Sequence, residues 1–103
     1  METSINHRNH ERLPFHSQFA VQNGHRDIGR GIDLSTSGMG FFTKERLEVG
    51  TRVNLIFQND IFLVEGIVRH CTQDASESEY RNGVRFTTEA RFIMPVLMML
   101  EGA

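Results

Sequence analysis

Apolar and polar side chains alternate along much of the chain between residues 13 and 86. A two-residue period is typical of a β-strand that buries one face, because successive side chains point to opposite faces. The pattern therefore predicts a chain made mostly of half-buried strands. The positions that it places on the buried faces are Phe15, Ser17, Phe19, Val21, Met39, Phe41, Val53, Leu55, Phe57, Phe62, Val64, Gly66, Val68, Tyr80, Val84 and Phe86.

Turn-forming residues separate the alternating segments. Asn23-Gly24 is a strong signal for a tight turn, Gly50 closes a polar connector, and Asn59-Asp60 marks a further turn. The last two strands are separated by a polar loop at residues 72–79. Strands are therefore expected at residues 13–22, 28–33, 38–43, 51–58, 61–71 and 80–88.

The last fifteen residues break the two-residue period. Their apolar side chains recur at spacings of three and four, which predicts a helix. Its packing face is expected to comprise Phe92, Val96, Met99 and Leu100, and Pro95 is expected to start or kink it. Met94, Met98 and Met99 are interpreted as core packing rather than as a partner surface.

Short strands separated by turns and followed by one helix are typical of an antiparallel barrel or sandwich. We expect an all-β fold, a six- to seven-stranded antiparallel barrel with the C-terminal helix closing one open end. A chain of 103 residues is one domain. Residues 1–12 are polar and unpatterned and cannot bury enough apolar area to order themselves, so they are expected to form a flexible arm on a domain at 13–103.

Charge and composition narrow the functional classes. The net charge is −2, and basic residues exceed acidic ones only within residues 1–30. A broad nucleic-acid-binding surface is therefore not expected, and any anionic ligand should be small and lie near the N-terminal third. Few aromatic side chains are expected to be exposed beside basic ones, which also argues against DNA or RNA as a partner.

The remaining bulk features point to a soluble, cytoplasmic protein. Cys71 is the single cysteine, so no internal disulfide forms, and its strand context predicts a small, buried or half-buried side chain. The longest apolar run, near Pro95, is too short for insertion into a membrane, and the N-terminus lacks the apolar segment of a signal peptide.

Two polar clusters stand out from the strand pattern. Arg8 and Arg12 form an RxxxR sequence just before the first expected strand, and Asp33, Ser35 and Gly38 form a DxSxxG sequence after the second. Either motif alone is weak, but their order, spacing and strand context are specific. Together they resemble the signature of the PilZ domain, a bacterial receptor family for the second messenger cyclic di-GMP. Residues 83–86 also resemble the closing strand of that family, so the resemblance covers essentially the whole chain.

This resemblance implies a PilZ-like barrel of the Greek-key or split-barrel type and a ligand held between the Arg8–Arg12 arm and the Asp33–Gly38 loop. Guanidinium groups form paired hydrogen bonds with phosphate oxygens or with O6 and N7 of guanine, which suits Arg8 and Arg12. The carboxylate of Asp33 can accept the N1–H and N2–H₂ donors on the opposite edge of guanine. The hydroxyl of Ser35 suits a phosphate or base contact.

Four further residues are assigned around this site. Gly38 is expected to supply a positive φ or to allow a close backbone approach. His7, next to the first motif arginine, and Ser37, within the loop, are expected to contact the ligand. Arg69 is expected to stack its planar guanidinium on a guanine.

Other interpretations of the same residues remain open. Arg8 and Arg12 taken alone would be solubilising charges, and Asp33 and Ser35 could be turn formers that bond their own backbone. The second interpretation fits a PilZ-fold adaptor that binds protein and no nucleotide. A receptor without an output domain must act on an unidentified effector protein, in motility, biofilm or exopolysaccharide control, through the C-terminal helix or the ligand face.

No catalytic or metal-binding pattern emerges. The five histidines and one cysteine lack the spacing of a structural zinc site, and an unstructured histidine-bearing arm explains them better. Ser35 and Ser37 lack the sequence context of a serine nucleophile. We therefore expect a protein that is not an enzyme and has no cofactor, with cyclic di-GMP as its ligand.

Overall fold

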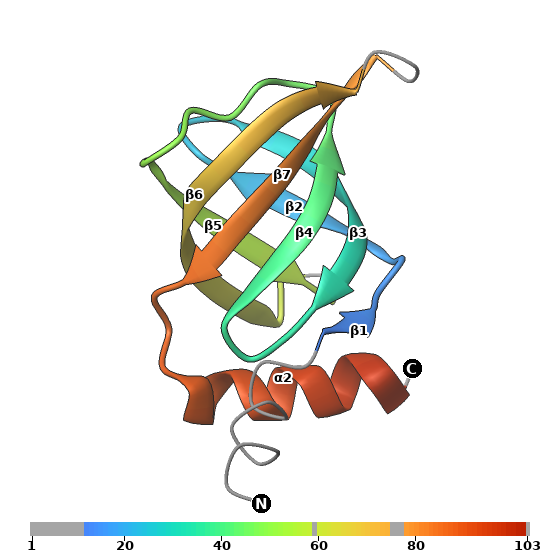
Figure 1. The fold of residues 1–103 in the computed structure, drawn as a ribbon. Coiled ribbons are helices and arrows are strands. Elements are labelled where there is room, and N and C mark those ends of the chain that lie inside the picture. Colours follow the sequence, from blue (N-terminus) through green and yellow to red (C-terminus); the bar gives the residue numbers. More distant parts are fainter. Residues whose placement is uncertain (1–11, 59, 75–77, 103) are drawn as a thin grey trace, which may run out of the picture.

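The computed structural model describes residues 12–58, 60–74 and 78–102 (Figure 1). This part of the chain contains seven strands and one helix. The helix, labelled α2, follows the last strand. The elements are β1 (Leu13–Pro14), β2 (Gln18–Gln22), β3 (Arg26–Leu34), β4 (Gly38–Thr43), β5 (Arg52–Phe57), β6 (Phe62–Asp74), β7 (Glu79–Phe86) and α2 (Ala90–Gly102).

Six of the strands close into an antiparallel barrel in the order β3-β2-β5-β6-β7-β4, and pairing between β3 and β4 completes the ring. The short β1 pairs with the end of β3 and lies outside the ring. Strands β2, β3 and β4 are consecutive neighbours, and β5 returns to lie beside β2, which is the Greek-key arrangement. The predicted all-β barrel with a C-terminal helix is confirmed.

The first predicted strand, residues 13–22, is in fact two strands. Strand β1 ends at Pro14 and β2 begins at Gln18, so Ser17 lies in an exposed connection and its predicted place on the buried face is wrong. The break lets β1 and β2 pair with different parts of the long β3. Gly31 makes this possible, because a Cβ there would lie 2.3 Å from the backbone oxygen of Phe15.

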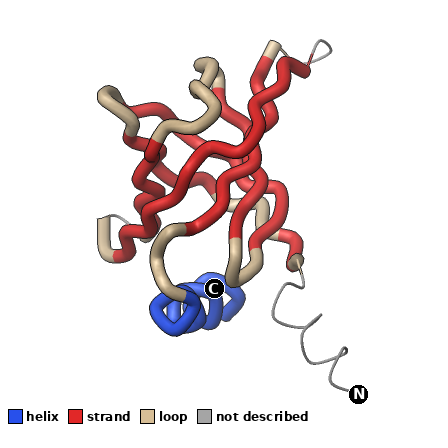
Figure 2. Tube along the Cα trace, turned by 60° about the vertical axis from the view of Figure 1, so that its left-hand side comes forward, coloured by secondary structure: helices blue, strands red, loops and turns tan. Residues whose placement is uncertain are grey.

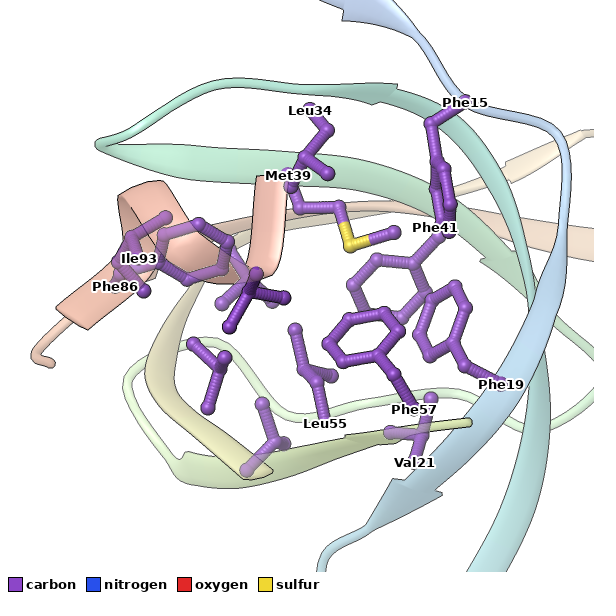
Figure 3. Packing of buried hydrophobic residues seen from close by; sticks show 14 of the residues in the cluster. Phe15, Phe19, Val21, Leu34, Met39, Phe41, Leu55, Phe57, Phe86 and Ile93 are labelled. Atoms are coloured by element: carbon purple, nitrogen blue, oxygen red, sulfur yellow. The ribbon is translucent and has the colours of Figure 1, made fainter. Parts of the chain in front are cut away.

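Aromatic and aliphatic side chains fill the barrel interior (Figure 3). Phe19 contacts several other rings, with its own ring 5.3 Å from that of Phe41 and 5.0 Å from that of Phe57. Phe15 contacts both Phe19 and Phe57. Met39 and Phe41 are completely buried, so the alternation of the sequence located the core correctly in β4.

Helix α2 lies across one end of the barrel (Figures 1 and 2). Its packing face consists of Ile93, Val96 and Leu97, which join the barrel core. Of the face predicted from the sequence, Val96 is buried, but Phe92 and Met99 are more than half exposed. The side chain of Leu100 lies outside the described residues. The helix begins at Ala90, so Pro95 lies within it and does not start it.

The methionines of α2 do not form part of the core. Met94, Met98 and Met99 are all exposed, which corrects their interpretation as core packing. The physical reason is that α2 is apolar on several sides, and only one side can face the barrel. Cys71 is a half-buried free cysteine, as predicted. Among the described residues, no helix combines the length and apolarity that crossing a membrane would require.

Two register shifts interrupt the regular pairing. In β3 the extra residue is Ile32, between the pairs Gly31–Phe41 and Asp33–Gly40. In β6 the extra residue is Arg69, between the pairs that Val68 and His70 form with β7. Such bulges re-aim the side chains that follow them, and both occur where polar residues of the predicted site lie.

Candidate functional site

Arg12 and Asp33 are joined by an ion pair. The Nη2 of Arg12 donates to Oδ1 of Asp33 over 2.9 Å, and both side chains keep substantial exposure. The contact follows from strand pairing, because β1 places Leu13 opposite Leu34 and Pro14 opposite Asp33. Continued by one residue, this register puts Arg12 diagonal to Asp33 on the same face, within reach of a long side chain, so the two sequence motifs meet at this point.

Asp33 is held by β4 as well as by Arg12. Its Oδ1 also accepts a hydrogen bond from the backbone N–H of Gly40, at 3.1 Å. A Cβ on residue 40 would lie only 2.8 Å from that oxygen, so glycine leaves room for the carboxylate. The hydrogen bond from Arg12 lowers the pKa of Asp33 despite partial burial, and the Gly40 N–H and the charge of Arg81 lower it further. The carboxylate therefore stays ionised near neutral pH.

Ser35 organises the loop between β3 and β4. Its Oγ accepts hydrogen bonds from the backbone N–H groups of Ser37 and Gly38, both at 3.2 Å, and lies 3.1 Å from the Oγ of Ser37. The side chain is only 1% exposed. Every contact of this hydroxyl lies within the loop, so Ser35 shapes the turn and does not line the open pocket described below.

Gly38 is required by a close approach to β7. A Cβ on this residue would lie 2.4 Å from the backbone oxygen of Val84. Its φ is not positive, so of the two reasons predicted for glycine here, the close approach is the one that applies. The neighbouring Ser37 accepts a hydrogen bond from the N–H of Phe86 through its backbone oxygen, which ties the loop to the end of β7.

An open pocket of about 410 Å³ lies against this loop. It is lined by Arg12, which precedes β1, by Asp33 of β3, by Ser37 and Gly38 at the loop, and by basic residues of β6 and β7. The described lining residues are Arg12, Asp33, Ser37, Gly38, Met39, Gly40, Arg69, His70, Arg81, Asn82, Gly83, Val84 and Arg85.

The pocket is strongly basic. Four arginines line it, and Asp33 is the one acid among its described lining residues. Arg81 and Arg85 lie four residues apart on the outer face of β7, which is about 13 Å along an extended strand. Three of the four arginines come from residues 69–85. The expectation that an anion site would lie near the N-terminal third is therefore only partly correct.

Glycines and a histidine form the floor between the arginines. Gly40 of β4 pairs directly with Gly83 of β7, so no side chain rises from either position. The imidazole of His70 occupies the space above Gly83, where a Cβ would lie 2.1 Å from its Cε1. The bulge at Arg69 turns His70 to the outer face, because strict alternation along β6 would point His70 inward like Val68, two positions before it.

The structure thus brings together Arg12, Asp33, Ser37, Gly38 and Arg69, as the sequence led us to expect. Ser35 lies beneath them in the loop. Arg8 and His7 lie outside the described residues. Sequence reasoning missed the pocket residues Gly40, His70, Arg81, Gly83 and Arg85. Arg81 and Arg85 had been placed correctly on the outer face of their strand, but their proximity to Asp33 depends on the pairing of β4 with β7.

The described residues contain no group of three or more side chains suited to bind a metal ion. The charge, the shape and the single carboxylate instead suit an anionic ligand that also carries hydrogen-bond donors. A pocket of this kind can pair its guanidinium groups with phosphate oxygens and its carboxylate with N–H groups.

Comparisons with known proteins agree with this architecture. The family model described as "PilZ domain" matches residues 6–92 of the chain. Among solved structures, that of K. pneumonia MrkH in its apo state is similar, with a TM-score of 0.61 and 22% sequence identity. The match covers 87% of this chain and 49% of MrkH, so the chain spans about half the length of that protein. This likeness shows a shared fold. No curated protein sequence matches the chain significantly.

Proposed function

This chain belongs to the PilZ family, and we propose that it is a receptor for cyclic di-GMP. PilZ domains bind ligands and are not enzymes, so we assign the chain no catalytic role. The observation that carries the proposal is the meeting of both signature motifs, through Arg12 and Asp33, at the edge of a pocket with four arginines. As the receptor of an intracellular messenger, the protein would work in the cytoplasm.

The chemistry of the pocket matches the ligand group by group. Cyclic di-GMP carries two phosphates with one negative charge each, and two guanines. Arg81 and Arg85 are separated widely enough to meet different parts of such a compact dianion. The imidazole of His70 lies over Gly83, so a planar base could stack on that ring or on the guanidinium of Arg69.

Arg12 and the guanine edge compete for Asp33. The guanidinium of Arg12 presents planar N–H donors to the carboxylate, and the N1–H and N2–H₂ edge of guanine presents the same kind of donors. We propose that the ligand takes over Asp33 and that Arg12 then moves to a phosphate or to O6 and N7 of a guanine. Arg8 and His7 would join from the same arm.

This exchange would move the residues that precede β1. Arg12 holds the start of the described chain against β3 in the free protein. Ligand binding would replace that contact and so change the surface offered to an effector protein. We propose that the effector acts in motility, biofilm or exopolysaccharide control.

Isothermal titration calorimetry with cyclic di-GMP tests the receptor function. We expect the wild-type chain to bind, and Arg12→Ala or Asp33→Ala to weaken binding about tenfold or more, because each removes a charge-assisted contact. Arg91→Ala is a matched control, since Arg91 is an exposed arginine on α2. Unchanged affinity in both site variants would refute the assigned site.

Cyclic di-AMP should bind more weakly than cyclic di-GMP, because adenine lacks the N1–H group from which Asp33 would accept a hydrogen bond.

The alternative function is a PilZ-fold adaptor that binds protein and no nucleotide. The observation that favours it is the exposed apolar face of α2, formed by Phe92, Met94, Met98 and Met99. An adaptor would release no heat with cyclic di-GMP and would retain its partner in a pull-down without ligand. A receptor would show binding heat and a partner whose recovery depends on the messenger.

A further inference from the structure

Two rows of side chains cross the outer face of the barrel on four neighbouring strands, in the spatial order β3, β2, β5, β6. Each residue of a row is the pairing partner of the next residue in that row, so the members of a row lie side by side. The apolar row consists of Ile28, Ala20, Ile56 and Leu63. The polar row beside it consists of Arg26, Gln22, Asn54 and Glu65.

The apolar row is exposed at its two ends. Ile28 is 61% exposed and Leu63 is 60% exposed, although both belong to regular strands. Between them Ala20 and Ile56 lie lower, and a hollow of about 460 Å³ opens over them. The hollow is lined by apolar residues and by charged ones, among them Arg26 and Asp60. Raised apolar side chains beside such a hollow give a surface that can interlock with a matching one.

The polar row carries opposite charges at its ends. Arg26 stands beside Ile28 on β3, and Glu65 stands beside Leu63 on β6, with two uncharged amide side chains between them. Each charge also has contacts within the chain. Arg26 donates to Asp60 over 3.3 Å, and Glu65 lies 3.8 Å from Arg52 and accepts a hydrogen bond from the hydroxyl of Thr87 over 2.9 Å. All four charged side chains are more than 40% exposed, so both charges are accessible to a partner.

We propose that this face pairs with the same face of a second copy of the chain. A two-fold axis in the plane of the interface, parallel to the strands, reverses the order of each row. Ile28 of one copy then meets Leu63 of the other, and Ala20 meets Ile56. In the polar row Arg26 meets Glu65 and Gln22 meets Asn54. Both rows are complementary to their own reversed copies.

The charges select this axis over the alternative. A two-fold axis parallel to the rows would instead place β3 of one copy opposite β3 of the other. Arg26 of both copies would then lie at the same end of the interface, away from Glu65 of either copy. The selected axis keeps the strands of the two sheets roughly aligned, which is a common way for sheets to pack. The ligand pocket lies mostly on β4 and β7, across the ring from β2 and β5, and it reaches β3 and β6 only at Asp33, Arg69 and His70, away from the two rows, so the dimer leaves it open. The inference therefore stands apart from the proposed function.

Sedimentation velocity over a range of about 10 to 500 µM tests the pairing, because an interface of modest area gives a weak dimer. The wild-type chain should shift from monomer to dimer with rising concentration. Leu63→Asp should stay monomeric throughout. Met98→Asp is the matched control, since Met98 is 67% exposed but lies on α2, and it should dimerise like the wild type. If the wild-type chain remains monomeric over this range, the proposal that this face binds a second copy is refuted.

Charge reversal identifies the interface itself. Arg26→Glu alone places like charges opposite each other twice in the dimer, and so does Glu65→Arg. Each should raise the dissociation constant about tenfold, whereas Arg91→Glu on α2 should not. An equimolar mixture of Arg26→Glu and Glu65→Arg restores opposite charges at both positions, so it should dimerise more tightly than either variant alone. A mixture no tighter than its components overturns this arrangement, and so does a dimer insensitive to Leu63→Asp.

Discussion

Arg12 and Asp33 are 21 residues apart in the chain, and their side chains meet at 2.9 Å because β1 pairs with the last residues of β3. The pair joins the two halves of the PilZ signature. The carboxylate of Asp33 is thus paired with a guanidinium of the same chain. A ligand that uses this carboxylate must displace or share Arg12, which makes the ion pair the natural starting point for tests of the site.

The ionisation of Asp33 should make stability depend on pH. Arg12 lowers the pKa of Asp33 in the folded state below its ordinary value of 3.8, so the stabilisation is fully present above that value and is lost as pH falls through the folded-state pKa. In urea unfolding, the free energy of unfolding of the wild-type chain should exceed that of Asp33→Asn by a constant margin above about pH 5. The margin should shrink below pH 3.8, and it should be smaller in an Arg12→Ala background. A margin that grows toward acid contradicts this assignment.

Gly40→Ala should weaken ligand binding without unfolding the protein. The new Cβ would lie 2.8 Å from Oδ1 of Asp33, at the end of a side chain that can move aside. Movement of the carboxylate would break its contacts with Arg12 and with the backbone at residue 40, and calorimetry should show an affinity for cyclic di-GMP about tenfold lower. In an Asp33→Ala background the same substitution should change little. An equal loss in both backgrounds would show that Gly40 acts independently of Asp33.

Ser35→Ala should destabilise the fold. Its buried hydroxyl accepts hydrogen bonds from two backbone N–H groups, and their loss should lower the free energy of unfolding by about 1–3 kcal/mol. Chemical denaturation measures the difference. Ser17→Ala, at an exposed serine, should change the same quantity by less than about 0.5 kcal/mol. Similar values for the two serines would argue against a structural role for Ser35.

Gly83→Ala should be rescued by a second substitution. The added methyl group would lie 2.1 Å from the imidazole of His70, and displacing that ring should cost about 1–3 kcal/mol of unfolding free energy. Removing the ring with His70→Ala should make Gly83→Ala nearly neutral. A double-mutant cycle based on thermal or urea unfolding gives the coupling directly. Additive effects of the two substitutions would mean that the ring does not lie over Gly83.

Replacing Arg81 or Arg85 with Gln should lower the affinity for cyclic di-GMP. Both arginines line the pocket from β7, and each should account for about a tenfold change through its contact with a charged ligand. Arg52→Gln is a suitable control, because Arg52 is exposed on β5 and does not line the pocket. Titrations at two salt concentrations should show a weaker salt dependence in the Arg81 and Arg85 variants. Wild-type affinity in both would exclude β7 from the site.

The barrel could be predicted from the sequence because burial itself produces the alternation. Met39, Phe41, Leu55 and Val68 are fully buried where the two-residue period placed them. The choice of the packing face of α2 could not be predicted in the same way. Ile93 faces the barrel and Phe92 does not, although both are large and apolar. Only contact with the open end of the barrel decides between them.

The signature residues could be located from their motif, whereas the rest of the pocket could not. Arg81 and Arg85 were correctly expected to point outward. Their convergence on Asp33 depends on the pairing of Gly40 with Gly83, which joins segments far apart in the chain. The outward position of His70 depends on a single extra residue in β6. Local periodicity contains no information about either feature.

That extra residue, Arg69, stands outside the pairing of β6 with β7. Val68 points into the barrel and His70 points out of it although they are two positions apart, because the strand gains one residue between them. Val68 and His70 face adjacent residues of β7, so a chain without Arg69 could keep both partners and leave His70 outward and Cys71 inward. Evolution could therefore have gained this arginine of the pocket by inserting a single codon, with no change to the pairing on either side of it.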